Sequence, residues 1–178
     1  QIVINTGDEA MKVTLTLNNA SITCLDAPAI MVEKANKLKL VLADGSENTV
    51  TSGVEGTAPA ADASGAAIFS KDDLDIEGSG KLTVNGYMND GIKSATTDKD
   101  GKGFITVSGG DVTVSASGDG IDAATTLDIT GGTLRVDTLG DGVDASSKAL
   151  KAETSISISG GELELNSIDA AVRCVADV

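Results

Sequence analysis

The chain repeats a pattern in which a strand of alternating apolar and polar residues is followed by a glycine turn and a second such strand. The clearest copies lie at 74–84, 105–114, 127–136 and 156–165. In the third copy, Leu127, Ile129, Leu134 and Val136 share one face, and the polar residues between them share the other. Strict alternation of this kind predicts half-buried β-strands. No stretch shows sustained helical periodicity.

A short apolar step precedes each pair of strands and marks the repeat. Its aliphatic residues align as Ile30, Ile68, Ile92, Ile121, Val143 and Val172. The gaps between them are 38, 24, 29, 22 and 29 residues. A base interval of about 22 residues, lengthened by insertions, is typical of one turn of a parallel β-solenoid. Loops are therefore expected at 53–65, within Lys93–Phe104 and within Asp144–Ser155.

These intervals predict a right-handed parallel β-helix of about six coils, with residues 1–178 as one domain around one core. An antiparallel sandwich also contains many short strands, but it explains near-identical units in a retained register poorly. Stacked Ile and Val fill such a core without large aromatic side chains, and aromatic residues make up 2% of the chain. Because the chain starts at Gln1, we expect it to be a processed or excised piece. No apolar run approaches the roughly 20 residues that span a bilayer.

The charge of the chain restricts its partners. The formal net charge is −14, with 27 acidic and 13 basic residues, so nucleic acid and anionic lipid are repelled. Acidity alone keeps a secreted protein soluble, but carboxylates also hold cations. Histidine is absent, which excludes His-based acid–base catalysis and the usual zinc or copper sites.

Aspartates recur at one position of the aligned units. If the units are coils, Asp90, Asp119 and Asp141 form one column, and the neighbouring column reads Lys93, Asp122, Asp144 and Arg173. Two carboxylates about 5 Å apart repel by roughly 3 kcal/mol at an effective dielectric near 20. Calcium takes 6–8 oxygen ligands, so we predict that it compensates this cluster.

Two further observations bear on the metal hypothesis. Asp-Gly is a turn signal, and an aspartate can accept hydrogen bonds from nearby backbone amides, so turn chemistry alone also explains the aspartates. Asp98 and Asp100 stand in a D-x-D-G pattern within "TDKDGKG" (97–103). The pattern is similar to the start of an EF-hand loop without its distal glutamate, and it adds two candidate calcium ligands.

Several stretches together resemble a secreted bacterial carbohydrate-binding domain family. They are "VTLTLNNASITC", "LKLVLADGSENTVTSG", "AAIFSKDDLDIEGSGKLTVNG", "NDGIKS", "DGKGFITVSGGDVTVSASGDGIDA" and "LDITGGTL". The resemblance covers about residues 11–165. It implies a pectate-lyase-like parallel β-helix that binds calcium, polygalacturonate and cellulose.

The resemblance also implies which residues form the calcium and glycan surface. Through "FSKDDL" and the "DGI" steps these are Lys71, Asp72, Asp73, Asp90, Asp119 and Asp141. Lys93, beside the aspartate columns, and Tyr87, the one tyrosine, are further candidates for contacts with polysaccharide.

Three functions remain open. The first is a secreted or cell-surface, monomeric, non-catalytic module in which calcium bridges protein carboxylates to polygalacturonate or pectin, with cellulose as a further ligand. The second is a calcium-dependent polyuronate lyase, in which a basic residue removes the C5 proton. Its candidate bases are Lys71, Lys93, Lys148, Lys151 and Arg135. The third is a structural adhesin segment.

Overall fold

The computed structural model describes residues 1–56, 65–95, 101–139 and 146–176. These residues form β-strands in three parallel sheets, and none of them lies in a helix. The described residues therefore contain no helix long and apolar enough to cross a membrane. The candidate ligands Asp98, Asp100, Asp141 and Asp144 lie outside the described residues.

The three sheets are called A, B and C here. Sheet A contains β1 (Ile2–Asn5), β4 (Ile30–Lys34), β7 (Ala66–Ser70), β10 (Asp90–Ser94), β13 (Ile121–Ala123), β16 (Leu150–Ala152) and β19 (Val172–Cys174). Sheet B contains β2 (Lys12–Leu17), β5 (Lys37–Leu42), β8 (Asp73–Gly78), β11 (Ile105–Val107), β14 (Thr126–Ile129) and β17 (Ser155–Ile158). Sheet C contains β3 (Ser21–Cys24), β6 (Glu47–Ser52), β9 (Lys81–Gly86), β12 (Asp111–Ala116), β15 (Thr133–Thr138) and β18 (Glu162–Asn166).

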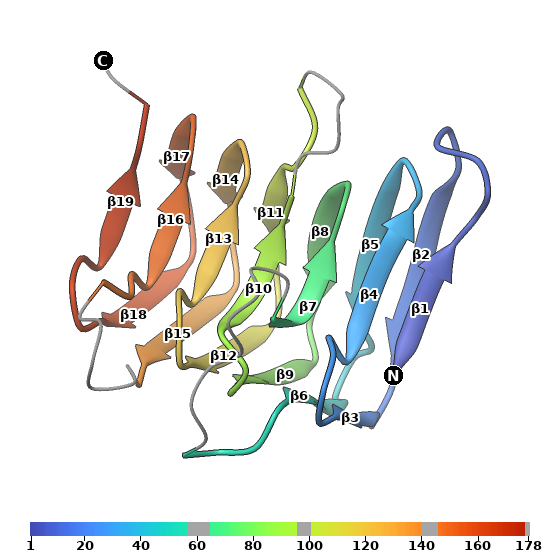
Figure 1. Cartoon of the computed structure of the whole chain (residues 1–178), viewed down its shortest axis with the longest axis horizontal. Coiled ribbons are helices and arrows are strands. Elements are labelled where there is room, and N and C mark those ends of the chain that lie inside the picture. Colours follow the sequence, from blue (N-terminus) through green and yellow to red (C-terminus); the bar gives the residue numbers. More distant parts are fainter. Residues whose placement is uncertain (57–64, 96–100, 140–145, 177–178) are drawn as a thin grey trace.

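Successive strands pass from sheet A to B to C and back to A, so every three strands make one coil. Each strand pairs in parallel with the strand three places further along the chain, and the coils stack along one axis (Figure 1). Six complete coils precede β19 among the described residues, which confirms the all-β, parallel, solenoid-like architecture. The right-handed sense and the single domain stay predictions.

The register corrects the predicted alignment at two points. The first coil begins at Ile2, because Ile2 pairs with Ile30. A coil start at Val143 is wrong, because Ile121 pairs with Leu150 and Leu150 pairs with Val172. The insertion therefore precedes the sixth sheet A strand, between β15 and β16, and does not follow it. The resemblance of "DGVDA" (141–145) to "DGIDA" (119–123) does not reflect equivalent positions in neighbouring coils.

Aliphatic columns fill the interior. Leu38, Leu74, Ile105 and Leu127 are paired in order along sheet B and are fully buried. The predicted inward side of the 127–136 unit is confirmed, because Leu127, Ile129, Leu134 and Val136 are all buried. Outward residues of the same strands are thereby held at one position per coil, about 4.8 Å apart.

The Asp-Gly steps of sheet A owe their glycines to close packing. A Cβ atom on Gly120 would lie 2.2 Å from Val136 Cγ1 and 2.7 Å from the carbonyl oxygen of Ala149. A Cβ atom on Gly91 would likewise lie 2.2 Å from Val114 Cγ1 and 2.7 Å from the carbonyl oxygen of Gly120. Glycine at these steps therefore lets the chain turn against the sheet C core.

We expect Gly120→Ala to lower the free energy of unfolding by about 1–3 kcal/mol, because the added methyl group overpacks the corner. Gly65→Ala is the control, because its Cβ would make only ordinary contacts at 3.4 Å or more. Urea unfolding measures both. Equal stability of the two variants would contradict the close packing at Gly120.

Candidate functional site

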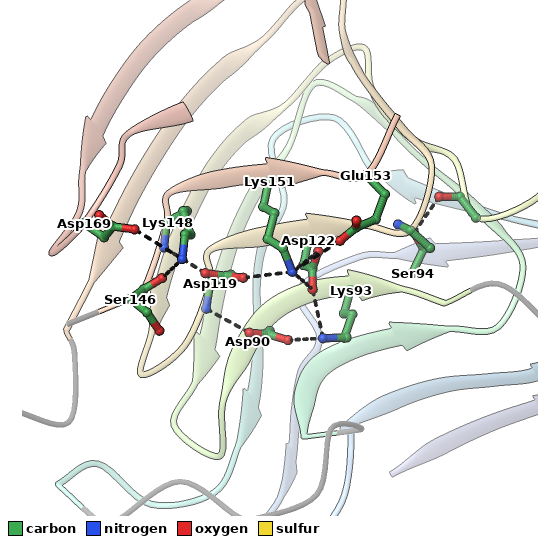
Figure 2. A network of polar contacts seen from close by, with 12 residues as sticks. Asp90, Lys93, Ser94, Asp119, Asp122, Ser146, Lys148, Lys151, Glu153 and Asp169 are labelled. Atoms are coloured by element: carbon green, nitrogen blue, oxygen red, sulfur yellow. Dashed lines mark hydrogen bonds and ion pairs between the residues drawn. The ribbon is translucent and has the colours of Figure 1, made fainter. Parts of the chain in front are cut away.

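A polar pocket of about 400 Å³ lies on sheet A, over β10, β13 and the segment leading into β16. It is lined by Asn89, Asp90, Lys93, Ser117, Gly118, Asp119, Asp122, Ser146, Ser147, Lys148 and Lys151. The parallel register aligns Lys93, Asp122 and Lys151 on three consecutive coils. Figure 2 shows these side chains converging, with aspartates and lysines linked in one network. We call this the sheet A pocket.

One row of the network ties each coil to the next through backbone amides. Asp90 accepts a hydrogen bond from the Asp119 N–H at 2.8 Å, and Asp119 accepts one from the Lys148 N–H at 2.8 Å. These two aspartates thus bond backbone amides 29 residues away in the chain, whereas the turn-chemistry hypothesis concerned nearby amides. The amide that each one binds belongs to the following coil.

The second row pairs carboxylates with lysines. Lys93 Nζ lies 2.7 Å from Asp90 Oδ2 and 2.9 Å from Asp122 Oδ2. Lys151 Nζ lies 3.3 Å from Asp122 and 3.6 Å from Asp119. The side chains of Asp90 and Asp122 are 4% and 8% exposed, so these pairs are largely shielded from water. Each of the three aspartates therefore has a lysine partner.

Burial and charge shift the pKa values in this network. Burial raises the pKa of Asp90 above its ordinary value, although Lys93 acts in the opposite direction. Burial alone would lower the pKa of Lys93, but Asp90 and Asp122 outweigh that effect, so the net pKa lies above its ordinary value. The pKa of Lys151 is also raised, because Asp122 and Asp119 outweigh its burial. Both lysines are held as ammonium ions.

In the column of Lys93, Asp122 and Lys151, the structure replaces the predicted carboxylate ladder with an alternation of charges, whereas Asp90 and Asp119 stay neighbours in the other column. In the coil after Asp119 and Asp122, the neighbouring positions carry Lys148 and Lys151, where Asp141 and Asp144 were expected. The error follows from the misplaced coil start. Had Leu150 been aligned with Ile121, the sequence would have revealed Lys148 and Lys151 as members of the site.

This alternation changes the argument for a metal ion. Among the described residues, no group of three or more Asp, Glu, Cys or His side chains is placed to hold one ion. The carboxylates of Asp90, Asp119 and Asp122 already bond lysines or amides. They do not fit a calcium ion in this arrangement, and calcium binding by the chain stays a prediction.

The other predicted residues that the structure describes lie outside the sheet A pocket. Asp73 accepts hydrogen bonds from the Gly103 and Phe104 amides and pairs with Lys102 at 2.9 Å. The buried Asp72 accepts a hydrogen bond from the Ala35 amide at 3.2 Å. These two carboxylates hold neighbouring coils together.

Lys71 and Tyr87 are half-buried and do not line the pocket. Burial, followed by the charge of Glu55, raises the pKa of Tyr87. Of the five residues predicted to contact polysaccharide, Lys93 lines the pocket and the other four do not.

Comparison with known proteins adds a family and a fold. Residues 1–97 and 88–178 match the family described as "Carbohydrate-binding domain-containing protein". A protein of that description from Acetivibrio thermocellus is 34% identical over 118 residues, which cover 65% of this chain and 38% of the relative. The chain thus spans little more than a third of that relative's length.

The structure of the polysaccharide lyase-like protein from C. thermocellum, a gadolinium derivative, aligns with this chain with a TM-score of 0.76 at 23% identity. The alignment covers 99% of this chain and 78% of that one, and this likeness supports the fold alone.

We expect Lys93→Met to lower the free energy of unfolding by about 3–5 kcal/mol, because it removes the ammonium group shared by two buried carboxylates. Lys12→Met is the matched control, since Lys12 is exposed on sheet B, and its change should stay within about 0.5 kcal/mol. Chemical unfolding at neutral pH measures both. If Lys93→Met lowers the free energy of unfolding as little as the control does, the ion pairs of Lys93 with Asp90 and Asp122 contribute little to stability.

The raised lysine pKa values predict a loss of stability in alkali. A folded-state pKa above the ordinary value of 10.5 means that the native state binds the proton more tightly than the unfolded state. The stabilisation is therefore complete below pH 10.5 and declines as the pH rises through the folded pKa values. Urea unfolding at increasing pH above 10.5 should show that the parent and Lys93→Met come closer in free energy of unfolding. A difference in free energy that stays constant with pH would contradict the raised pKa of Lys93.

Proposed function

Because the chain belongs to the carbohydrate-binding domain-containing protein family, we propose that it is a non-catalytic module that binds an acidic polysaccharide, polygalacturonate or pectin, in the sheet A pocket. The setting of such a ligand is extracellular, and we propose a secreted or cell-surface location on that ground. The observation that carries the proposal is the gathering of Lys93, Lys148 and Lys151 around one open pocket.

The pocket brings three ammonium groups together on an acidic protein, where they balance the three aspartates of the pocket. A polyuronate is repelled by a net charge of −14, so binding needs cationic groups at the point of contact. Lys148 and Lys151 are the most suitable. Lys148 pairs with the part-exposed Asp169 at 3.2 Å, and Lys151 reaches Asp119 at 3.6 Å besides its closer pair with Asp122 at 3.3 Å. A sugar carboxylate can join or replace the contacts to Asp169 and Asp119. Ammonium–carboxylate hydrogen bonds are among the stronger polar contacts.

The remaining lining residues suit a sugar. Asn89, Ser117, Ser146 and Ser147 bring amide and hydroxyl groups to the same pocket. Such groups both donate and accept hydrogen bonds, as sugar hydroxyls do. The lysines would orient the carboxylate of a uronate residue, while these neutral groups contact its ring hydroxyls.

The electrostatics favour binding over a lyase reaction. A lysine that removes the C5 proton of a uronate works best with a pKa lowered toward the working pH. The carboxylates around Lys93 and Lys151 raise the pKa of both lysines, which keeps them protonated. We therefore expect no accumulation of unsaturated ends when polygalacturonate is incubated with the protein, and steady growth of their ultraviolet absorbance would reverse this assignment.

We expect the double variant Lys148→Gln with Lys151→Gln to bind polygalacturonate about tenfold more weakly or worse, because charged hydrogen bonds to the ligand are lost. Lys12→Gln with Lys81→Gln is the control, since it removes the same charge from exposed lysines on sheets B and C. Affinity electrophoresis in polygalacturonate gels measures both variants. Equal retardation of the two variants would remove the pocket from the binding surface.

The same gels test calcium. Retardation that persists in excess chelator supports binding by lysine alone. Retardation that needs added calcium supports an ion bridge between protein and sugar carboxylates.

A further inference from the structure

Lys148 differs from the other two lysines of the sheet A pocket in the carboxylate that balances it. Within the part of the chain that the structure describes, its ammonium group has one carboxylate partner, Asp169, with Nζ 3.2 Å from Oδ2. The same Nζ donates a hydrogen bond to the backbone carbonyl of Ser146. The side chain of Asp169 is 40% exposed, whereas that of Lys148 is 12% exposed. The charge of a shielded lysine is thus balanced by a carboxylate that water reaches.

Lys151, in contrast, keeps buried partners. It lies 3.3 Å from Asp122 and 3.6 Å from Asp119, and both of these side chains are largely shielded from water. The exposed Glu153 approaches Lys151 only to 3.7 Å, as a third carboxylate. Loss of an exposed partner therefore leaves Lys151 compensated, whereas loss of Asp169 would leave Lys148 without a carboxylate.

Asp169 lies beside the pocket, in the turn between β18 and β19, and is not part of the pocket lining. Its N–H donates to the carbonyl of Ser147 at 3.1 Å, and the Ala149 N–H donates to the carbonyl of Ala170 at 3.2 Å. These bonds fix the backbone of the turn, while an exposed side chain can still change rotamer quickly. Figure 2 shows Asp169 at one end of the network, on the side of Lys148 away from Lys151.

We propose that Asp169 sets the specificity of the sheet A pocket by taking the place of a ligand carboxylate at Lys148. The inference rests on the proposed binding of polyuronate. A uronate carboxylate that arrives beside Lys148 displaces Asp169, whose side chain turns into water. A uronate residue that carries a methyl ester has no charge to offer, so Asp169 stays in place and keeps Lys148 paired. The pocket therefore tolerates an esterified residue at this position.

The physical reason lies in the cost of a shielded ammonium group without a partner. Without Asp169, an ester beside Lys148 would leave that ammonium uncompensated, and such a group is costly. A free carboxylate would then gain the whole ion pair, so the position would become selective for the free acid. With Asp169 present, the ligand gains only the difference between its own ion pair and the one that it replaces. Part-exposed ion pairs are weak, so the effect of Asp169 on affinity is about two- to fivefold.

The test compares the parent with Asp169→Asn, which keeps the shape of the side chain and removes its charge. Asp128→Asn is the matched control, because it removes the same charge from the outer face of sheet B. The probes are polygalacturonate and a highly methyl-esterified polygalacturonate, in affinity electrophoresis at about 0.15 M ionic strength, where charges further apart than about 8 Å are screened. The quantity compared is the ratio of the dissociation constant of the esterified polymer to that of the free acid.

We expect Asp169→Asn to bind polygalacturonate about two- to fivefold more tightly than the parent and the esterified polymer no more tightly, so that the ratio rises by the same factor. Asp128→Asn and the charge-preserving Asp169→Glu should keep the ratio of the parent. In a Lys148→Gln background, Asp169→Asn should leave the ratio unchanged, because Asp169 acts through Lys148.

A ratio for Asp169→Asn equal to that of the parent would overturn the inference. A rise in the ratio that persists in the Lys148→Gln background would also overturn it, because Asp169 would then act by another route. Both results leave polygalacturonate binding by the parent intact and so leave the proposed function standing. A parent that polygalacturonate does not retard would instead overturn the proposed function, and this inference with it.

Discussion

In-register pairing of parallel coils is the constraint on which the rest of the structure depends. Each strand pairs with the strand three places along the chain, so a residue has the equivalent residue of the next coil as its neighbour. Apolar residues benefit directly, because columns such as Leu38, Leu74, Ile105 and Leu127 bury one another. For charged residues the same stacking is destabilising when neighbouring coils carry like charges, because like charges in one column repel.

The sheet A pocket shows how the chain meets this rule. Lys93, Asp122 and Lys151 follow one another in a single column, so each carboxylate or ammonium has an opposite charge beside it. The three lysines and three aspartates of the pocket sum to zero formal charge within a protein of net charge −14. Buried ion pairs add little net stability, but removing one partner is costly, so the network fixes the positions of its members more than it stabilises the fold. A sugar carboxylate would meet lysines that are already positioned.

The outward surfaces of sheets A and C follow from the same stacking with different residues. On sheet A, the column Lys93, Asp122 and Lys151 alternates in charge and borders a pocket of about 400 Å³. On sheet C, two outward columns are uncharged over four coils, and their Thr hydroxyl groups repeat with the strands. One scaffold thus presents a charged recess and a flat neutral face on different sheets. The core beneath both surfaces consists of the same kind of aliphatic columns, so substitutions on one surface leave the other in place.

The amino-acid sequence by itself determined the kind of fold. Strict alternation in units such as 127–136 and a recurring interval were enough to predict parallel stacked coils, because burial of one face requires that pattern. The insertions hid the register, however. The local likeness of 119–123 and 141–145 suggested a coil start at Val143, whereas hydrogen bonding and core packing place it at Leu150. A shift of seven residues changes every neighbour across the coils, so only the tertiary structure decided that Lys148 and Lys151 lie beside Asp119 and Asp122. A column forms between residues far apart in the chain, and the length of the loop between them decides which residues meet.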